Sequence, residues 1–483
     1  MNILILSNGA PKYHHFFNEI AKKLSQDGHK IVFAVDSTYS VVENRISKVD
    51  FPFYNFSDFF KSDGCDFEVL DNYRDFNLNY ALLSDFERSE VYGLWGRKRV
   101  EYFDNLKSSL LNFFSHIVDR ESVDLVIYEN VSNTFAYFCW FVCQKCDVKY
   151  MGFTPSRIPG RFWLTDDPFS EHKKVDETLD KINEGKIDIP QWLYSWSAEH
   201  ISSIEEVTPD YMRFNNLGNI SLMEKYFNKD KFKKLLFAIQ SIKTDGRGSF
   251  QRVSPLKMSW LMFLRSYKRK KKAKKLTHYY ETPVAGEKYF LYPLHFHPES
   301  STSVLSGAYL NEYEVIRNMA FNLPEGARLY VKDHVSAFGL PSLKFYESLC
   351  RLPNVRLLSY SENTKELIKN SSAVATLTST VGYEALLMGK KVFLFGSVFY
   401  QGHKNVVKVS DPKELHSLFG EACLSEPGDH DRDIFMYNVK FLCAYYMNTL
   451  KGSLNLMQGS RGARLLVEEV YPEFKMQLKT LFL

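Results

Sequence analysis

The sequence predicts an α/β protein with two doubly wound domains that face a cleft. Three observations support this fold class. Short apolar runs typical of buried strands alternate with amphipathic helical segments in both halves of the chain. The length of 483 residues exceeds what a single core usually organises. Polar side chains follow several of the predicted strands, where doubly wound sheets bind their ligands.

The first half begins with the strand pattern NILILSNG, an amphipathic helical segment, and the strand pattern KIVFAVDS. Two further predicted strands, VDLVIYEN (123–130) and VKYMGFT, flank the apolar helical segment NTFAYFCWFVCQKC. The loop SNGAPK lacks the three glycines of a dinucleotide fingerprint, so bound NAD is not expected.

The second half repeats this alternation. Predicted strands are KYFLYPLHF, RLYVKDH, VRLLSY, SSAVATLT and KVFLFG, with helical patterns between them. We therefore expect an N-terminal Rossmann-like domain (1–169), a mainly helical insertion with a basic linker (170–285) and a C-terminal Rossmann-like domain (286–430). Helices in 431–483 are expected to pack back across both domains.

Composition narrows the possible functions. The 61 basic and 57 acidic residues nearly balance, which gives no general case for nucleic-acid binding. The seven cysteines form no regular framework, so free thiols in a reducing cytosol fit better than zinc, and no metal is expected. The N-terminus has no signal-peptide pattern, and no apolar run reaches 18 residues. We therefore expect a cytoplasmic protein.

The segment LTSTVGYEALLMGKKVFLFG (377–396) joins a predicted strand, a hydroxyl-rich turn, a helix and another strand. Such a turn directs backbone N–H groups and a helix dipole at one point, where an anion can bind. The alternative is an ordinary helix cap by Ser379 or Thr380. The sequence leaves both interpretations open.

Four polar segments fall at carboxyl ends of predicted strands: HFHPES (295–300), KDH (332–334), SYSEN (359–363) and TSTVGYE (378–384). They supply imidazoles, a lysine and hydroxyls for a phosphate, and acids for ribose hydroxyls. The candidates include His297, Glu299, Lys332 and His334. The alternatives are a turn role for His297 and a solvated strand end for Lys332.

The runs YPLHFHPESST, LYVKDH and NTKELIKNSSAVATLTSTVGYEALLMGKKVFLFG resemble bacterial capsule polysaccharide biosynthesis proteins. The resemblance covers residues 285 to 405 best, with weaker support from MNILILSNGAPKYHHFFNEIAKKL and FTPSRIPGRFWLTDDPF. It implies a GT-B fold and transfer of Kdo, or a related nonulosonic sugar, from a CMP-activated donor. The N-terminal domain would then face the acceptor, and no cofactor is needed besides the donor.

The resemblance also implies site residues. His334, Ser379 and Thr380 would bind the nucleotide phosphate, and Glu384 would bind the ribose. In the family a proline follows this histidine, whereas Val335 follows His334 here. The segment HFHPE does contain a His-Pro pair, so His297 is a second candidate for the phosphate.

A donor of this type carries a carboxylate beside the reacting carbon, and its transfer needs an acid or base. Arg157 and Arg161 in SRIPGR are suited to the donor carboxylate. Some members of the family have a carboxylate nucleophile where this sequence has Met151, so that role cannot be carried over.

Other acids must then serve the reaction. Glu129 ends a predicted strand and is the first candidate, with Asp166 the second. A structural ion pair with the arginines is the alternative role for Asp166. His14 and His15 follow the first strand, and His15 is a further base candidate.

The segment SWLMFLRSYKRKKKAKKL (259–276) combines apolar residues with five consecutive cations. It is either a solvated linker or a patch that binds anionic lipid through 268–275. We expect contact with the inner-membrane surface, and an oligosaccharide or lipid-linked glycan as acceptor.

Two other functions remain open. One is a UDP-sugar-dependent GT-B transferase or epimerase, since the same strand, turn and helix serve those enzymes. The other is a non-catalytic scaffold in polysaccharide assembly, which the departures YMGF and KDHV permit.

Overall fold

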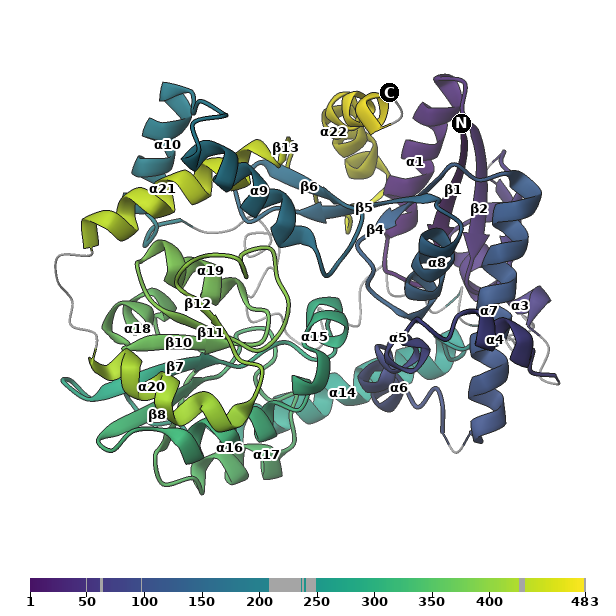
Figure 1. Ribbon diagram of the computed structural model, residues 1–483. Coiled ribbons are helices and arrows are strands. Elements are labelled where there is room, and N and C mark those ends of the chain that lie inside the picture. Colours follow the sequence, from purple (N-terminus) through teal and green to yellow (C-terminus); the bar gives the residue numbers. More distant parts are fainter. Residues whose placement is uncertain are drawn as a thin grey trace.

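Two β-sheets organise the protein, and each lies at the centre of its own α/β domain (Figure 1). The computed structural model describes residues 1–48, 50–60, 64–96, 98–207, 249–424 and 431–481, together with residues 236 and 239.

The N-terminal sheet has seven strands in the order β13-β6-β5-β4-β1-β2-β3. In its parallel part, β2 and β3 lie on one side of β1, and β4 and β5 lie on the other. The strand order therefore reverses between β1 and β4, which opens a crevice at the carboxyl ends of those two strands. Strands β5 and β6 form an antiparallel hairpin that turns at Gly160, whose φ is 71°. The strands are β1 Asn2–Ser7, β2 Lys30–Val35, β3 Phe53–Asn55, β4 Leu125–Glu129, β5 Lys149–Pro155, β6 Arg161–Thr165 and β13 Leu450–Lys451.

The C-terminal sheet has six parallel strands in the order β12-β11-β10-β7-β8-β9. Here the reversal lies between β7 and β10, so a second crevice opens at their carboxyl ends. The strands are β7 Lys288–Pro293, β8 Ala327–Lys332, β9 Val355–Leu358, β10 Ala373–Thr376, β11 Val392–Leu394 and β12 Val406–Lys408.

Helices cover both sheets and join the domains. The helices of the N-terminal half are α1 Tyr13–Gln26, α2 Thr38–Glu43, α3 Phe56–Phe59, α4 Phe67–Asn72, α5 Leu78–Leu83, α6 Phe86–Tyr92, α7 Val100–Glu121, α8 Thr134–Lys145, α9 Glu171–Asn183 and α10 Gln191–Ser202. Those that follow are α14 Pro255–Leu276, α15 Ser300–Leu305, α16 Glu312–Asn322, α17 Leu343–Cys350, α18 Thr364–Asn370, α19 Thr380–Leu387, α20 Leu415–Leu424, α21 Asp431–Met447 and α22 Ser460–Leu481. Short 3-10 turns cover Ile46–Lys48, Gly307–Tyr309 and Pro412–Glu414.

Burial of the apolar faces explains this layering. One core lies in the N-terminal domain and includes Phe474 of α22, which packs beside α1. A second core joins α9, α10 and α21 to one face of the C-terminal sheet, and a third covers the opposite face. The last two helices therefore serve different domains (Figure 1). Helix α14 crosses beneath both domains in the same view.

The predicted fold class is confirmed, because every strand expected from the sequence is present. The sequence analysis missed β3, β6, β12 and β13, which are short edge-side strands. In the predicted insertion the structure contains α9, α10 and α14, while most of 208–248 lies outside the described residues. The exact domain boundaries stay a prediction.

Within the described ranges, no helix is long and apolar enough to cross a membrane. No cluster of three or more His, Cys, Asp or Glu side chains in these ranges is arranged to hold a metal ion, and the described cysteines are free.

Candidate functional site

The turn between β10 and α19 is held by several hydrogen bonds. Ser379 caps the helix, since its Oγ accepts from the Val381 N–H at 3.1 Å. The Ser379 N–H donates to Thr376 Oγ1 at 3.0 Å, and the Tyr400 hydroxyl donates to the Ser379 carbonyl at 2.6 Å. A Cβ at Gly382 would lie only 2.5 Å from that tyrosine oxygen. The glycine therefore allows the contact that fixes the turn.

Thr378 in this turn carries an unpartnered hydroxyl. The residue is only 6% exposed, and its Oγ1 is buried without a hydrogen-bond partner. A Cβ at Gly396 would lie 2.7 Å from Thr378 Cγ2, so the methyl group packs against this glycine. A buried hydroxyl without a partner costs free energy, which a bound acceptor would recover. The N–H groups of Ser379, Val381 and Gly382 already donate to Thr376 Oγ1, Ser379 Oγ and the Ser379 carbonyl, so the positive end of the α19 dipole, together with this hydroxyl, is what the turn offers an anion.

His295 supports the turn from β7. Its Nδ1 lies 2.7 Å from Glu312 Oε1, and its Nε2 lies 3.0 Å from Thr376 Oγ1. The Thr378 N–H donates to Nε2 at 3.3 Å. Nε2 must then be unprotonated, so the proton sits on Nδ1 and is donated to Glu312. The sequence analysis selected His297, two residues further along the chain, and missed His295.

His297 contacts two carboxylates instead of the turn. Its Nδ1 lies 2.9 Å from Glu87 Oε2, and its Nε2 lies 3.3 Å from Glu312 Oε2. Glu87 belongs to the N-terminal domain. A phosphate would have to displace one of these carboxylates to reach the ring.

His334 and Lys332 lie at the end of β8. His334 Nδ1 accepts from the Ser336 N–H at 3.1 Å, and burial lowers the pKa of His334 to about 4. The ring is therefore neutral, with a donor at Nε2. Lys332 donates to the Tyr360 carbonyl at 3.0 Å, and burial lowers its pKa too.

Glu384 forms a buried ion pair in α19. Its Oε1 lies 3.2 Å from Lys365 Nζ, which also donates to the Ile204 carbonyl at 2.8 Å. Burial raises the pKa of Glu384, and Lys365 partly offsets that effect. A ribose hydroxyl would have to share this carboxylate with the lysine.

Glu129 lies in the N-terminal domain, at the end of β4. The Ser132 hydroxyl donates to Glu129 Oε1 at 2.5 Å. Burial raises the pKa of Glu129 to about 7, although Ser132, Arg88 and Tyr13 all favour the charged form. The charge of Glu129 is the main cause of a raised pKa at Tyr13, and the charge of Glu299 from the C-terminal domain adds to it.

The predicted arginines have different surroundings. Arg161 is held by the C-terminal segment, since its Nε donates to Thr449 Oγ1 at 2.6 Å and its guanidinium stacks on Tyr446. Arg157 lies toward the cleft, where its charge opposes the raised pKa values of Glu171 and Glu299. Burial is the main cause of both raised values.

Asp166 and Glu171 contrast in the same region. Asp166 is exposed and pairs with Lys174 at 2.9 Å, so neither arginine holds it. Glu171 begins α9 and accepts from Asn130 Nδ2 at 3.1 Å. Burial raises the pKa of Glu171 to about 7. Sequence analysis missed this acid because only the folded chain brings α9 beside β4.

His14 and His15 begin α1 after the first strand, with ring centroids 4.0 Å apart. Burial lowers the pKa of His14 to about 4 and also lowers that of His15. Both rings are neutral at pH 7, so a base role for His15 stays chemically possible.

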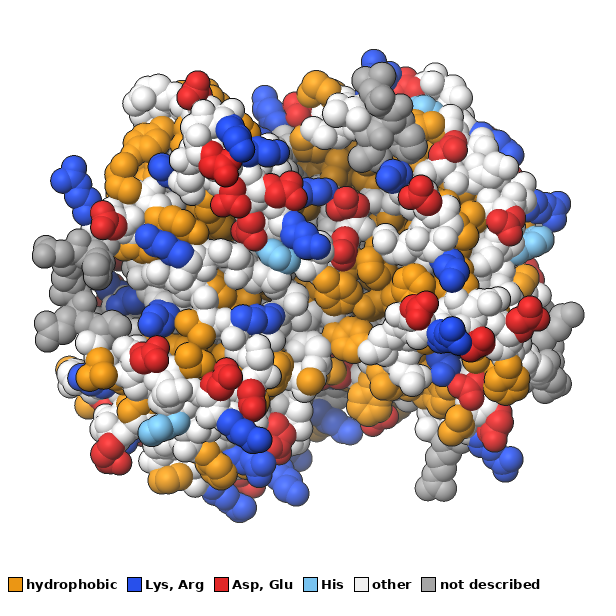
Figure 2. Space-filling view, in the orientation of Figure 1, with side chains coloured by type: hydrophobic (Ala, Val, Ile, Leu, Met, Phe, Trp, Pro, Cys, Tyr) orange, Lys and Arg blue, Asp and Glu red, His pale blue; other side chains and the backbone are white. Residues whose placement is uncertain are grey.

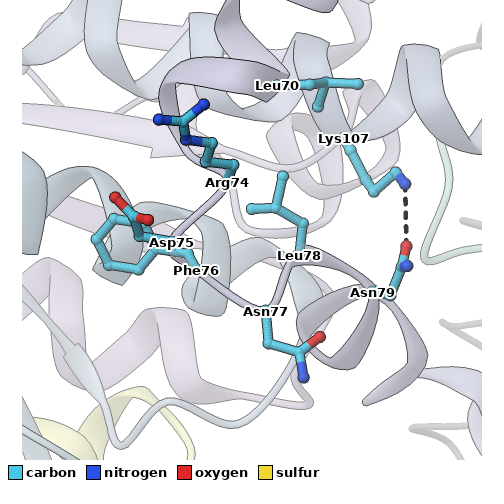
Figure 3. Close-up of a pocket in the computed structure, with 8 residues that line it drawn as sticks. All are labelled: Leu70, Arg74, Asp75, Phe76, Asn77, Leu78, Asn79 and Lys107. Atoms are coloured by element: carbon cyan, nitrogen blue, oxygen red, sulfur yellow. Dashed lines mark hydrogen bonds between the residues drawn. The ribbon is translucent and has the colours of Figure 1, made fainter.

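A separate hollow of about 470 Å³ lies on the N-terminal domain (Figure 3). Lys107 and Asn79 hydrogen bond across it at 3.0 Å. None of the predicted site residues lines it. Its lining residues are Leu70, Arg74, Asp75, Phe76, Asn77, Leu78, Asn79 and Lys107.

The arrangement of the two domains defines a fold class. Two Rossmann-like domains, each with polar side chains at the strand ends of its own reversal point, constitute the GT-B fold. Figure 2 shows them as two lobes.

Comparison with known proteins gives the family. Residues 202–415 match the family described as "Capsule polysaccharide biosynthesis protein". This match confirms the expected resemblance to the capsule polysaccharide biosynthesis family. Protein FixF of Sinorhizobium fredii is 32% identical over 157 residues, or 32% of this chain and 36% of FixF. The capsule polysaccharide modification protein LipA of Neisseria meningitidis serogroup B is 31% identical over 96 residues, which span 20% of this chain but 14% of LipA.

Solved structures align more weakly. The beta Kdo 2,4 transferase of Thermosulfurimonas dismutans KpsC is 13% identical over 67% of this chain and 79% of that chain, with a TM-score of 0.34. A Staphylococcus aureus MnaA–UDP structure is 9% identical over 99% of this chain and 97% of that chain, with a TM-score of 0.29.

The raised pKa of Glu129 predicts a pH-dependent stability effect. Below about pH 4.5 the carboxyl is neutral in both folded and unfolded states, whereas between pH 4.5 and 7 only the unfolded state ionises. The folded state therefore loses stability across this window as pH rises. Glu129→Gln has no such carboxyl and lacks this loss. The melting temperature of the variant minus that of the wild type should therefore be higher at pH 8 than at pH 5. The exposed Glu101→Gln is the control, and an equal difference at both pH values would contradict the buried carboxyl.

Proposed function

We propose that the protein is a glycosyltransferase. It would transfer a 3-deoxy-ulosonic or nonulosonic sugar, of the Kdo or pseudaminic and sialic type, from a CMP-activated donor to a growing capsule or surface polysaccharide. The observation that carries the proposal is the unpartnered hydroxyl of Thr378 beside the start of α19, which suits a phosphate. The match of residues 202–415 to the capsule polysaccharide biosynthesis family supports the choice of substrate class.

The donor phosphate would bind at the turn before α19. The Thr378 hydroxyl would donate to it, and the positive end of the α19 dipole would favour its charge. The Ser379 hydroxyl accepts from Val381 and keeps its own proton for a second bond. His334 offers its neutral Nε2–H, and Thr380 begins the helix.

The remaining parts of the donor would meet the flanking residues. Glu384 would share ribose hydroxyls with Lys365, and Arg157 would pair with the donor carboxylate. A guanidinium is suited to that role because it offers two parallel donors. Glu299, at the N-terminal end of α15, is a further candidate for hydroxyls of the nucleotide or sugar.

Glu129 would act as the general base. The acceptor hydroxyl gives its proton to Glu129 as its oxygen bonds to the anomeric carbon of the donor. The bond from that carbon to the phosphate oxygen breaks, and CMP leaves with the electron pair. A pKa of about 7 suits a base at neutral pH. Asp166 is the second candidate and stays more exposed.

The alternatives differ in the nucleotide that binds. A UDP-sugar transferase or epimerase would be stabilised by UDP, and a non-catalytic scaffold by no nucleotide. We expect selective stabilisation by CMP over CDP, UDP and GDP, measured as a rise in melting temperature.

A Thr378→Val variant separates binding from folding. Valine keeps the shape but removes the unpartnered hydroxyl, so the free protein should be as stable as wild type or slightly more stable. Loss of a hydrogen bond to a charged phosphate should weaken CMP binding about tenfold or more in calorimetry. Thr277→Val, on an exposed helix end, is the matched control. Unchanged CMP affinity in Thr378→Val would place the phosphate elsewhere.

We further propose that α14 contacts the inner-membrane surface. Trp260 and Tyr267 are 59% and 53% exposed, and exposed lysines follow them on the same helix. Arg269 and Lys272 instead bind carbonyls of 338–341, which attaches the helix to the C-terminal domain. A hollow of about 390 Å³ beside the start of α17 is lined by Lys268, Lys271, Lys272, Lys275, Ser342 and Leu343. Clustered lysines with aromatic neighbours suit anionic lipid headgroups.

Replacing Lys268, Lys271 and Lys275 by glutamine should release the protein from anionic vesicles. Each lysine near such a surface contributes about 1 kcal/mol, so the triple variant should bind about 100-fold more weakly at low salt. Glutamine at Lys181, Lys413 and Lys479, which are exposed on other elements, is the charge-matched control. Equal loss in both triple variants, or binding that persists in the first, would contradict a specific contact by α14.

A further inference from the structure

The loop after β7 lies where the two domains and the linker helix meet. His297 in this loop pairs with Glu87 of α6 and with Glu312 of α16. Its carbonyl accepts from Arg265 Nη2 of α14 at 3.1 Å. Figure 1 shows α6, α14 and α15 close together at the junction of the domains.

The surroundings of His297 favour its charged form. Each ring nitrogen faces a carboxylate: Nδ1 hydrogen bonds to Glu87, and Nε2 lies at ion-pair distance from Glu312 without a hydrogen bond. Burial alone would lower the pKa of His297, but the contacts with Glu312 and Glu87 raise it to about 10. The three side chains are 21%, 24% and 9% exposed for His297, Glu87 and Glu312. Solvent therefore screens this interaction only partly.

Glu312 extends the contact to the candidate donor site. Its Oε1 accepts from the Tyr292 hydroxyl at 3.1 Å, from the His295 N–H at 2.9 Å and from His295 Nδ1 at 2.7 Å. His295 in turn accepts from the Thr378 N–H. An unbroken series of polar contacts thus links α6 of one domain with the turn before α19 of the other.

A second interdomain contact lies beside the first. The Tyr80 hydroxyl of α5 donates to the Val304 carbonyl and accepts from the Gly307 N–H at 3.1 Å. Helices α5 and α6 are consecutive, so this short segment of the N-terminal domain docks on the C-terminal domain at two points.

We propose that Glu87, His297 and Glu312 form an interdomain clasp that holds the turn before α19 in its binding conformation, which makes Glu87 a positioning residue for the donor nucleotide. The clasp deepens the proposed function, because it takes the nucleotide of that proposal as its ligand. Glu87 reaches the turn only through the two histidines and Glu312. Coupling is reciprocal, so a nucleotide held by the turn would also strengthen the domain contact.

The first test compares Glu87→Gln with Glu90→Gln. Both glutamates lie on α6, but Glu90 is exposed and points outside the clasp. Glu87→Gln should weaken CMP binding in calorimetry about fivefold or more, the lower end of usual coupling between sites. It should also alter the His297 ring signals in ¹⁵N NMR, which a merely structural role elsewhere on α6 would leave unchanged. Glu90→Gln should match wild type in both measurements.

The second test measures the domain contact without any nucleotide. Cys146 and Cys350 are exposed and free, one in each domain, so they can carry a pair of spin labels after Cys65→Ser and Cys423→Ser. Glu87→Gln should broaden the distance distribution between the labels, whereas Glu90→Gln should not. If wild type fails to bind CMP, the donor proposal is overturned and this measurement alone decides on the clasp. A distance distribution and ring signals that do not differ between the two variants would overturn the clasp.

Discussion

The structure depends on a constraint of parallel sheets. Where the order of strands reverses, the connecting helices leave on opposite faces and a crevice opens at the carboxyl ends of two neighbouring strands. The protein has this point twice, between β1 and β4 and between β7 and β10. Glu129 ends β4, and the turn with Thr378 follows β10. Glu129 and the Thr378 turn therefore lie at the two places that the fold itself provides.

Burial lowers the pKa of histidines at these places and raises the pKa of carboxyl groups. It leaves His334 neutral and raises the pKa of Glu129 to about 7, so the side chains suited to donate to an anion or accept a proton are close to neutral. His297 is the exception, since two carboxylates hold it charged. Charge is thus kept at the junction of the domains, while Glu129 can change protonation near pH 7.

The fold could be predicted further than the site. Strand periodicity depends on neighbouring residues, and it located all the central strands of both sheets. Strand β6 was missed because RFWLT carries no clear alternation, and its partners are β5 across the hairpin at Gly160 and the distant β13. Polar strand ends were also recognised, yet the choice between His295 and His297 required knowledge of what each ring faces. Both follow the same strand, and only the fold directs one to the turn and the other to Glu87.

Some contacts depend on residues far apart in the chain, which no local pattern shows. Arg161 looked suited to a carboxylate, but Thr449 and Tyr446 hold its guanidinium. Glu171 lies beside Asn130 only because the fold brings the start of α9 to the residue that follows β4. The roles assigned to the site residues thus rest on local sequence, and the contacts in the structure leave fewer candidates for each role.

The central claim is that Glu129 takes the acceptor proton in a reaction that releases CMP. The most direct test measures kcat/KM for CMP release from CMP-Kdo, with acceptor glycan present, as a function of pH. The account predicts a rate that rises with pH and levels off above about pH 7, as Glu129 loses its proton. Glu129→Gln should then be slower by about 100-fold or more, with unchanged affinity for CMP. Near-normal turnover in Glu129→Gln together with an inactive Asp166→Asn would contradict it and assign the chemistry to Asp166.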